Sequence, residues 1–155
     1  MIVATALSAG SAFAQTTGTW TTNGPGNWSD TTKWSGGVGA GGVGATADFS
    51  TLDITAYNVV TLDAPVTLGT LKVADLTTLS NNWVFAGTNT LTFDNGASQP
   101  VLEIVNRFPV ISAPIAGTNG ISKTGAGTVT FSGDNSGLSG TLNLPDVIET
   151  NNAGV

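Results

Sequence analysis

Two residue types that carry much of protein chemistry, cysteine and histidine, do not occur in this chain of 155 residues. Without cysteine there is no disulfide bond and no thiolate metal site. Without histidine the chain lacks the side chain that most often serves as a general base and as a metal ligand. The composition therefore excludes the commonest routes to a zinc site and to a histidine-activated nucleophile.

Charge is scarce as well. Only 9% of the residues are charged, with ten acids against four bases and a net charge of −6. The four bases are scattered: Lys33, Lys72, Arg107 and Lys123. No basic stripe exists to neutralise phosphates, so we expect no nucleic-acid partner. Because 40% of the residues are apolar, the chain has the composition of a folded domain rather than of a disordered segment.

Helical periodicity is also missing, since no window of a dozen residues repeats its apolar positions every 3.6 residues. Short runs alternate between apolar and polar residues instead, and Gly, Asn, Asp or Pro bounds each run. The inward pairs are Val60/Leu62, Val66/Leu68, Leu71/Val73, Trp83/Phe85, Leu91/Phe93 and Leu102/Ile104. The pattern predicts an all-β chain with almost no helix.

One short unit recurs along the chain, with an outward Thr followed by inward and outward residues in turn. It reads GTLKV at residues 69–73, NTLTF at 89–93 and GTVTF at 127–131. Thr70 and Thr90 are 20 residues apart, and Thr90 and Thr128 are 38 apart, close to two steps of 19. Such a period predicts a parallel β-helix, in which these threonines stack as a ladder. An antiparallel β-sandwich also contains many short strands and is the alternative.

Residues 120–135 (GISKTGAGTVTFSGDN) resemble the autotransporter-associated β-strand repeat, whose pattern reads G-L-x-K-x-G-x-G-T-L-T-L-S-G-x-N. Leu138 stands where that family usually has an aromatic residue. The segment from Thr19 to Gly37, with its tryptophans, is similar to the opening of such bacterial surface proteins. The resemblance implies a secreted or cell-surface protein with a right-handed parallel β-helix, in which the repeat is associated with export of the passenger.

The two ends of the chain differ in composition from its middle. Residues 1–14 end in Ala12-Phe13-Ala14, an A-x-A cleavage pattern, so we expect a signal peptide whose basic start lies upstream of Met1. That apolar run is too short to span a bilayer, so we expect no membrane insertion. We assign residues 15–46 to a Gly/Trp-rich cap and 47–144 to β-helix repeats. Residues 145–155 are a loop or the start of a further repeat, and the remainder of a longer chain is expected to follow.

Three tryptophans, Trp20, Trp28 and Trp34, lie close together in the cap segment. Large rings can cover the open end of a solenoid core, which needs a cap for solubility. Flat rings can instead stack on sugars, so these three residues are also our candidate glycan contacts. We favour the cap.

The acids offer little to catalysis, since no two lie within two residues of each other. Asp75 and Asp94, 19 residues apart, would meet only if one coil placed them side by side; otherwise each caps its own turn. The turns at Asp94 and Asp134 match no calcium motif. We therefore expect no enzyme, no catalytic residue, no metal and no cofactor.

From these observations we expect a structural segment of a secreted or cell-surface bacterial protein, with extracellular glycans or neighbouring copies as the partners it would meet. A glycan-binding adhesin module is the first alternative. A polysaccharide-active β-helix enzyme is the second.

Overall fold

The computed structural model describes residues 15–77, 79–143, 145 and 147–149. The predicted signal peptide at residues 1–14 lies outside the described residues, as does most of the predicted tail at 145–155. Short strands follow one another along this part of the chain, and its only helices are two single-turn 3-10 segments. The prediction of an all-β chain with almost no helix is confirmed.

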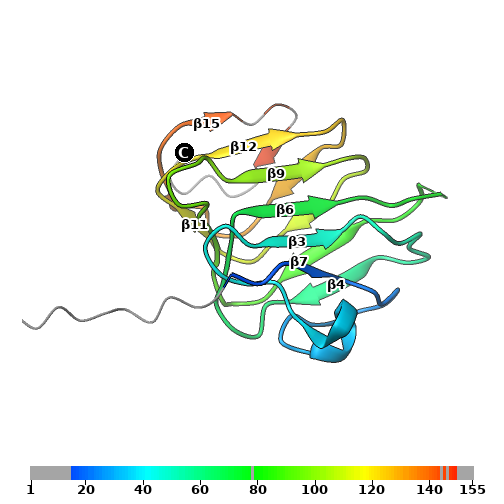
Figure 1. The fold of residues 1–155 in the computed structure, drawn as a ribbon. Coiled ribbons are helices and arrows are strands. Elements are labelled where there is room, and N and C mark those ends of the chain that lie inside the picture. The colour runs from blue at the N-terminus through cyan, green and yellow to red at the C-terminus, as the bar shows by residue number, and fades with distance from the viewer. Residues whose placement is uncertain (1–14, 78, 144, 146, 150–155) are drawn as a thin grey trace, which may run out of the picture.

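The strands form three sheets, in which each strand lies beside the strand one coil later (Figure 1). Sheet 1 consists of β1 (Gly18–Thr19), β3 (Thr46–Phe49), β6 (Thr70–Val73), β9 (Val101–Ile104), β12 (Ile121–Thr124) and β15 (Leu142–Asn143). Sheet 2 consists of β2 (Gly26–Asn27), β4 (Asn58–Thr61), β7 (Trp83–Ala86), β10 (Val110–Ile111), β13 (Val129–Phe131) and β16 (Val147–Glu149). Sheet 3 consists of β5 (Val66–Leu68), β8 (Leu91–Phe93), β11 (Ile115–Gly117) and β14 (Gly137–Leu138).

All pairings between these strands are parallel. The chain passes through sheets 1, 2 and 3 in turn, so β3, β4 and β5 make one coil and β6, β7 and β8 make the next. The predicted parallel β-helix is therefore confirmed, and the antiparallel β-sandwich is wrong. Parallel pairing across so many short strands is possible because each crossover is simply the rest of a coil.

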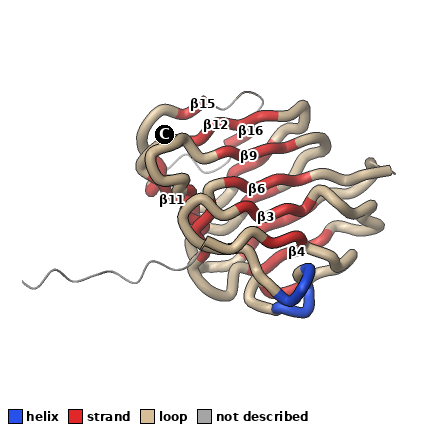
Figure 2. The backbone as a smooth tube through the Cα atoms, in the orientation of Figure 1, coloured by secondary structure: helices blue, strands red, loops and turns tan. Residues whose placement is uncertain are grey.

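The first coil differs from the others. It contains β1 and β2, but within the described residues it contributes no strand to sheet 3. In place of that strand come the 3-10 helices η1 (Thr31–Lys33) and η2 (Ser35–Gly37). Figure 2 shows them at one end of the stack, beyond β4. The segment assigned to the cap thus also carries the first two strands of the solenoid.

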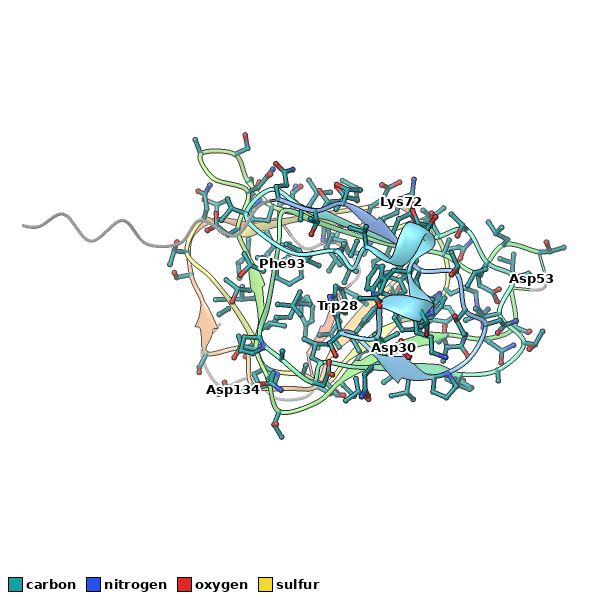
Figure 3. All side chains as sticks on the ribbon, turned by 60° about the horizontal axis from the view of Figure 1, so that its bottom comes forward. Trp28, Asp30, Asp53, Lys72, Phe93 and Asp134 are labelled. Atoms are coloured by element: carbon teal, nitrogen blue, oxygen red, sulfur yellow. The ribbon has the colours of Figure 1, made fainter. Side chains whose placement is uncertain are left out.

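Alternation along the strands creates a continuous core. All side chains of the six predicted inward pairs are at most 6% exposed. Figure 3 shows Phe93 inside the ring formed by the ribbon, with Lys72 outside it. Burying one such aliphatic or aromatic side chain contributes about 1.5–3 kcal/mol, so the stacked interior supplies most of the stabilisation.

The three occurrences of the repeated unit fall in three different sheets rather than at the same place in successive coils. Thr70 opens β6 in sheet 1, Thr90 precedes β8 in sheet 3, and Thr128 precedes β13 in sheet 2. The predicted ladder of these three threonines is therefore wrong. The register pairs Thr67 with Thr92 instead. Every face requires the same alternation, so the unit by itself does not identify which strands are neighbours.

Coil length varies along the stack. Thr46 pairs with Thr70, Thr70 with Val101, and Val101 with Ser122, so successive coils take 24, 31 and 21 residues. The extra residues of the longest coil lie in the loops at 74–82 and 94–100. A period near twenty describes the later coils only.

Packing between coils explains several positions of the segment that resembles the autotransporter repeat. Gly125 has φ of +82°, and a Cβ added there would lie 2.1 Å from the carbonyl oxygen of Ile104. A Cβ at Gly127 would lie 2.5 Å from the Ile104 side chain. Lys123 is buried, and its Nζ donates a hydrogen bond to the carbonyl of Gly125 at 3.1 Å. The residue types at these positions therefore follow from the close packing of one coil on the preceding coil.

Candidate functional site beside the aromatic cap

The three early tryptophans form one cluster at the N-terminal end of the core. Trp20, Trp28 and Trp34 are all buried. The centroids of Trp20 and Trp34 are 5.2 Å apart and those of Trp28 and Trp34 are 5.1 Å apart, both edge to face. This is the geometry that aromatic quadrupoles prefer. The predicted aromatic cluster is present, and it closes the end of the core.

Phe49, on the inward face of β3, connects this cluster to the coils. Its ring centroid lies 5.4 Å from Trp20, 5.6 Å from Trp28 and 5.4 Å from Trp34. On the other side it lies 5.1 Å from Trp83 and 5.0 Å from Phe85. The sequence analysis did not single out Phe49, although its alternation with Ala47 could have indicated an inward position.

The indole N–H groups hold the loop that covers the cluster. Trp28 Nε1 donates to the carbonyl of Ala40 at 2.9 Å, and Trp34 Nε1 donates to the carbonyl of Trp28 at 2.8 Å. Trp20 Nε1 donates to the carbonyl of Thr22 at 2.7 Å. Sugar stacking needs an open ring face, which buried rings do not offer. The glycan contact at the three tryptophans stays a prediction, and their burial counts against a three-ring platform.

A groove of about 440 Å³ opens beside the cap. An edge of Trp28 lines it, together with Ser29, Asp63, Pro65 and Thr67. The groove lies where the incomplete first coil leaves β5 as the edge strand of sheet 3. Its size is in the range of small-molecule sites. No local sequence pattern indicated it, because it results from a strand that the first coil does not form.

The backbone of β5 presents an unused donor to this groove. The carbonyl of Thr67 accepts a hydrogen bond from the N–H of Gly42 at 2.9 Å. In an extended strand the N–H and C=O of one residue point to the same side, so the N–H of Thr67 faces the same way. No group among the described residues accepts a hydrogen bond from it. A backbone N–H near the core normally finds a partner, so this one is available to a ligand or to water.

Asp63 supplies acceptors at the same groove. One of its carboxylate oxygens accepts from the N–H of Ser29 at 3.1 Å, and the other accepts from the Ser29 hydroxyl. The hydroxyl bond, aided by the N–H bond, lowers the pKa of Asp63 below its usual 3.8. Hydrogen bonds from the Thr32 hydroxyl and N–H likewise lower the pKa of nearby Asp30. Both carboxylates are ionised at neutral pH, so neither has the raised pKa of a general acid for glycoside cleavage.

Four acids cap their own turns, as the sequence analysis predicted for them. Asp30, Asp48, Asp94 and Asp134 each accept a hydrogen bond from the backbone N–H two residues later. Asp75 follows a strand of sheet 1 and Asp94 follows a strand of sheet 3, so the coil does not stack these two carboxylates. Among the described residues there is no group of three or more Asp or Glu side chains placed to hold a metal ion.

Comparison of the chain with protein-family models, with curated proteins and with solved structures gave no match. In the described part of the chain, no helix has the length and apolarity needed to cross a membrane.

Proposed function

We propose that this chain is a structural segment of a secreted or cell-surface bacterial protein, a β-helical stalk or passenger of autotransporter type. The observation that carries this proposal is the uninterrupted parallel stack from β1 to β16 over one buried core. Each coil adds about 4.8 Å along the stack, so the six strands of sheet 1 span about 24 Å as one connected body. Such a body holds whatever it is joined to at a fixed distance.

Three further observations support this role. The outward residues of the strands in sheet 1 are mostly polar, and Lys72 and Glu103 of neighbouring coils lie 3.6 Å apart. The N-terminal end of the core is closed by aromatic rings, as a solenoid requires. The positions shared with the autotransporter repeat, Gly125 and Gly127 among them, are positions where coil must pack on coil.

Location outside the cell is the part of the proposal that most needs a test. An epitope inserted after the exposed Ala97, in the turn before β9, would mark the folded segment. The complete gene would be expressed in its source bacterium with native upstream codons. We expect intact cells to bind the antibody, or the epitope to appear in the medium, and external protease to remove the surface signal. An epitope that becomes accessible only after lysis, like a cytoplasmic marker, would contradict the proposal.

Glycan binding is the second candidate function, and we propose the groove as its site in place of the tryptophan rings. The unpartnered N–H of Thr67 and the ionised Asp63 offer one donor and two acceptors beside the apolar Pro65 and the edge of Trp28. A neutral pyranose ring carries both hydroxyl donors and acceptors and an apolar face, so it matches this set.

Titration of the full chain with neutral monosaccharides, followed by amide and indole NMR shifts, tests the second function. Binding in the groove should move the Thr67 amide and the Trp28 indole resonances, and Asp63→Ala should weaken the response. Asp134→Ala, which removes an exposed turn carboxylate elsewhere, is the matched control and should leave it unchanged. Resonances that stay fixed at millimolar sugar would eliminate this function.

A further inference from the structure

The outward face of sheet 2 is apolar, unlike the outward face of sheet 1. The register aligns Val59 of β4 with Val84 of β7, and Val84 with Val110 of β10. Each of these side chains points away from the core, because its strand neighbours on both sides point inward. Three valines on consecutive coils therefore form a straight row on the surface.

Two aromatic rings border this row. Tyr57, just before β4, is 63% exposed, and Phe108, just before β10, is 54% exposed. Both residues lie beside Asn82, which belongs to the coil between them. Asn58 pairs with Trp83, so the preceding residues Tyr57 and Asn82 are also neighbours. On the other side, the N–H of Phe108 donates to Asn82 Oδ1 at 2.9 Å. Tyr57, Val59, Val84, Phe108 and Val110 together make what we call the sheet 2 face.

Apolar exposure continues around the adjoining corner between sheets 1 and 2. Leu76, Leu79 and Val105 are exposed in the loops that join these sheets. Six of the eight large hydrophobic residues exposed in the described chain thus belong to this face and corner. Soluble proteins seldom leave contiguous apolar patches of this kind without a partner.

The exposed ring of Phe108 is held in place by its neighbours. Arg107 adopts φ of +68°, and Leu79, with φ of +48°, is the only other described residue besides glycine in that region. The guanidinium of Arg107 lies 5.4 Å from the Phe108 centroid, and its Nε donates to the carbonyl of Asn81 at 3.2 Å. A left-handed backbone outside glycine costs energy and is kept where the surrounding contacts determine it. The ring is therefore presented in a fixed position before any partner arrives.

We propose that the sheet 2 face binds a second copy of this chain, face to face, as a symmetric dimer. Charge indicates this occupant: the chain carries a net charge of −6, yet no charged residue lies in β4, β7 or β10, the three strands that carry this face. Sheet 1, in contrast, presents Asp48, Lys72 and Glu103. Two copies can thus meet on sheet 2 without opposing carboxylates.

The shape of the face suits the same occupant. Two sheets pack face to face about 10 Å apart, with side chains of one between those of the other. The valine row has one side chain per coil, so its spacing is the same in both copies. A two-fold axis near Val84 therefore lets the valines of one copy pack between those of the other. Val84, on the middle strand of the row, therefore lies at the centre of the predicted contact.

Cysteine cross-linking in the full chain tests the dimer, because the natural sequence has no cysteine to interfere. Val84→Cys should give a disulfide-linked dimer on mild oxidation. Thr92→Cys, at an outward position of sheet 3, is the matched control and should stay monomeric. Equal cross-linking of the two variants, or none with Val84→Cys, would overturn the proposal.

Sedimentation of uncrosslinked protein gives an independent readout. The wild type should associate with rising concentration, and Val84→Lys should raise the dimer Kd at least about tenfold, because it places like charges opposite each other. Thr92→Lys should leave the Kd unchanged. Wild-type protein that stays monomeric up to about 100 µM would overturn the dimer.

Discussion

The ring of Phe49 lies 5.4 Å from the ring of Trp34, edge to face at 71°, so the first strand of the complete coils closes directly on the cap. Phe49 also contacts four other rings, from Trp20 in the cap to Phe85 in the next coil. The Phe49 side chain thus packs against both the cap and the coils that follow. Truncating it should therefore destabilise the cap and the coils together.

We predict that Phe49→Ala lowers the free energy of unfolding by about 3–5 kcal/mol, the cost of a large cavity in a well-packed core. Urea denaturation followed by tryptophan fluorescence measures it. Phe108→Ala, which removes an exposed ring, should change stability by less than about 0.5 kcal/mol at concentrations where the protein is monomeric. Similar losses of unfolding free energy in both variants would show that the contacts of Phe49 do not stabilise the aromatic cluster.

A buried carboxylate organises the longest loop between sheets 1 and 2. Asp75 is fully buried, and its oxygens accept hydrogen bonds from the N–H groups of Ile54 at 3.0 Å, Ser80 at 3.0 Å and Asn81 at 3.2 Å. Asn106 of the following coil holds the backbone of Asp75 with a reciprocal pair of bonds. This network joins three coils.

We therefore predict that Asp75→Ala destabilises the protein by about 3 kcal/mol or more, because several buried N–H groups lose their acceptor. Asp94→Ala, which removes one exposed turn bond, should cost about 1 kcal/mol or less. Thermal unfolding by circular dichroism compares the two. Equal shifts in melting temperature would mean that the Asp75 network adds nothing beyond an ordinary turn.

Substitutions at two glycines distinguish the cost of backbone strain from the cost of a steric clash. Gly36 and Gly125 both have positive φ, at +66° and +82°, but only Gly125 faces a neighbouring backbone where a Cβ would sit. Gly36→Ala should cost about 1–2 kcal/mol, the price of a left-handed alanine. Gly125→Ala should add a clash with Ile104 and cost at least about 3 kcal/mol, measured by urea denaturation. Equal losses of stability in the two variants would contradict the close approach of Gly125 to the backbone of Ile104.

The bonds from Ser29 to Asp63 predict a defined pH dependence. They lower the pKa of Asp63 in the folded state, so they stabilise the fold above the usual pKa of 3.8. That contribution disappears as the pH falls through the lower, folded-state pKa. The stability difference between wild type and Ser29→Ala should therefore be constant at neutral pH and vanish in acid. Ser35→Ala, at another exposed serine of the cap, should show no such pH dependence.

The sequence predicted the interior of this fold better than its connections. Alternation identified the inward residues, since a strand with one buried face must place its apolar residues at every second position. It could not identify strand neighbours, because Thr70, Thr90 and Thr128 begin the same unit in three different sheets. Pairing depends on the lengths of the loops between strands, and those loops carry no pattern.

The candidate site was less accessible to sequence reasoning. Trp28 was correctly placed in a cap, but the groove beside it depends on a missing strand and on Asp63, which lies more than thirty residues away along the chain. The unpaired N–H of Thr67 is a property of an edge strand, and only the sheet order reveals which strand is at the edge. Residue types alone do not contain that information.

The central claim is that the coils form one rigid stack, and a single distance tests it most directly. Thr19, Asp48, Lys72, Glu103 and Thr124 are consecutive partners across sheet 1. Spin labels on Thr19→Cys and Thr124→Cys are therefore separated by four strand spacings, about 19 Å between Cα atoms, although the two residues are 105 positions apart in the sequence. Double electron–electron resonance should give one narrow distribution near that value, widened only by the label arms. A broad distribution, or one centred far beyond it, would contradict the rigid solenoid and the structural role proposed for it.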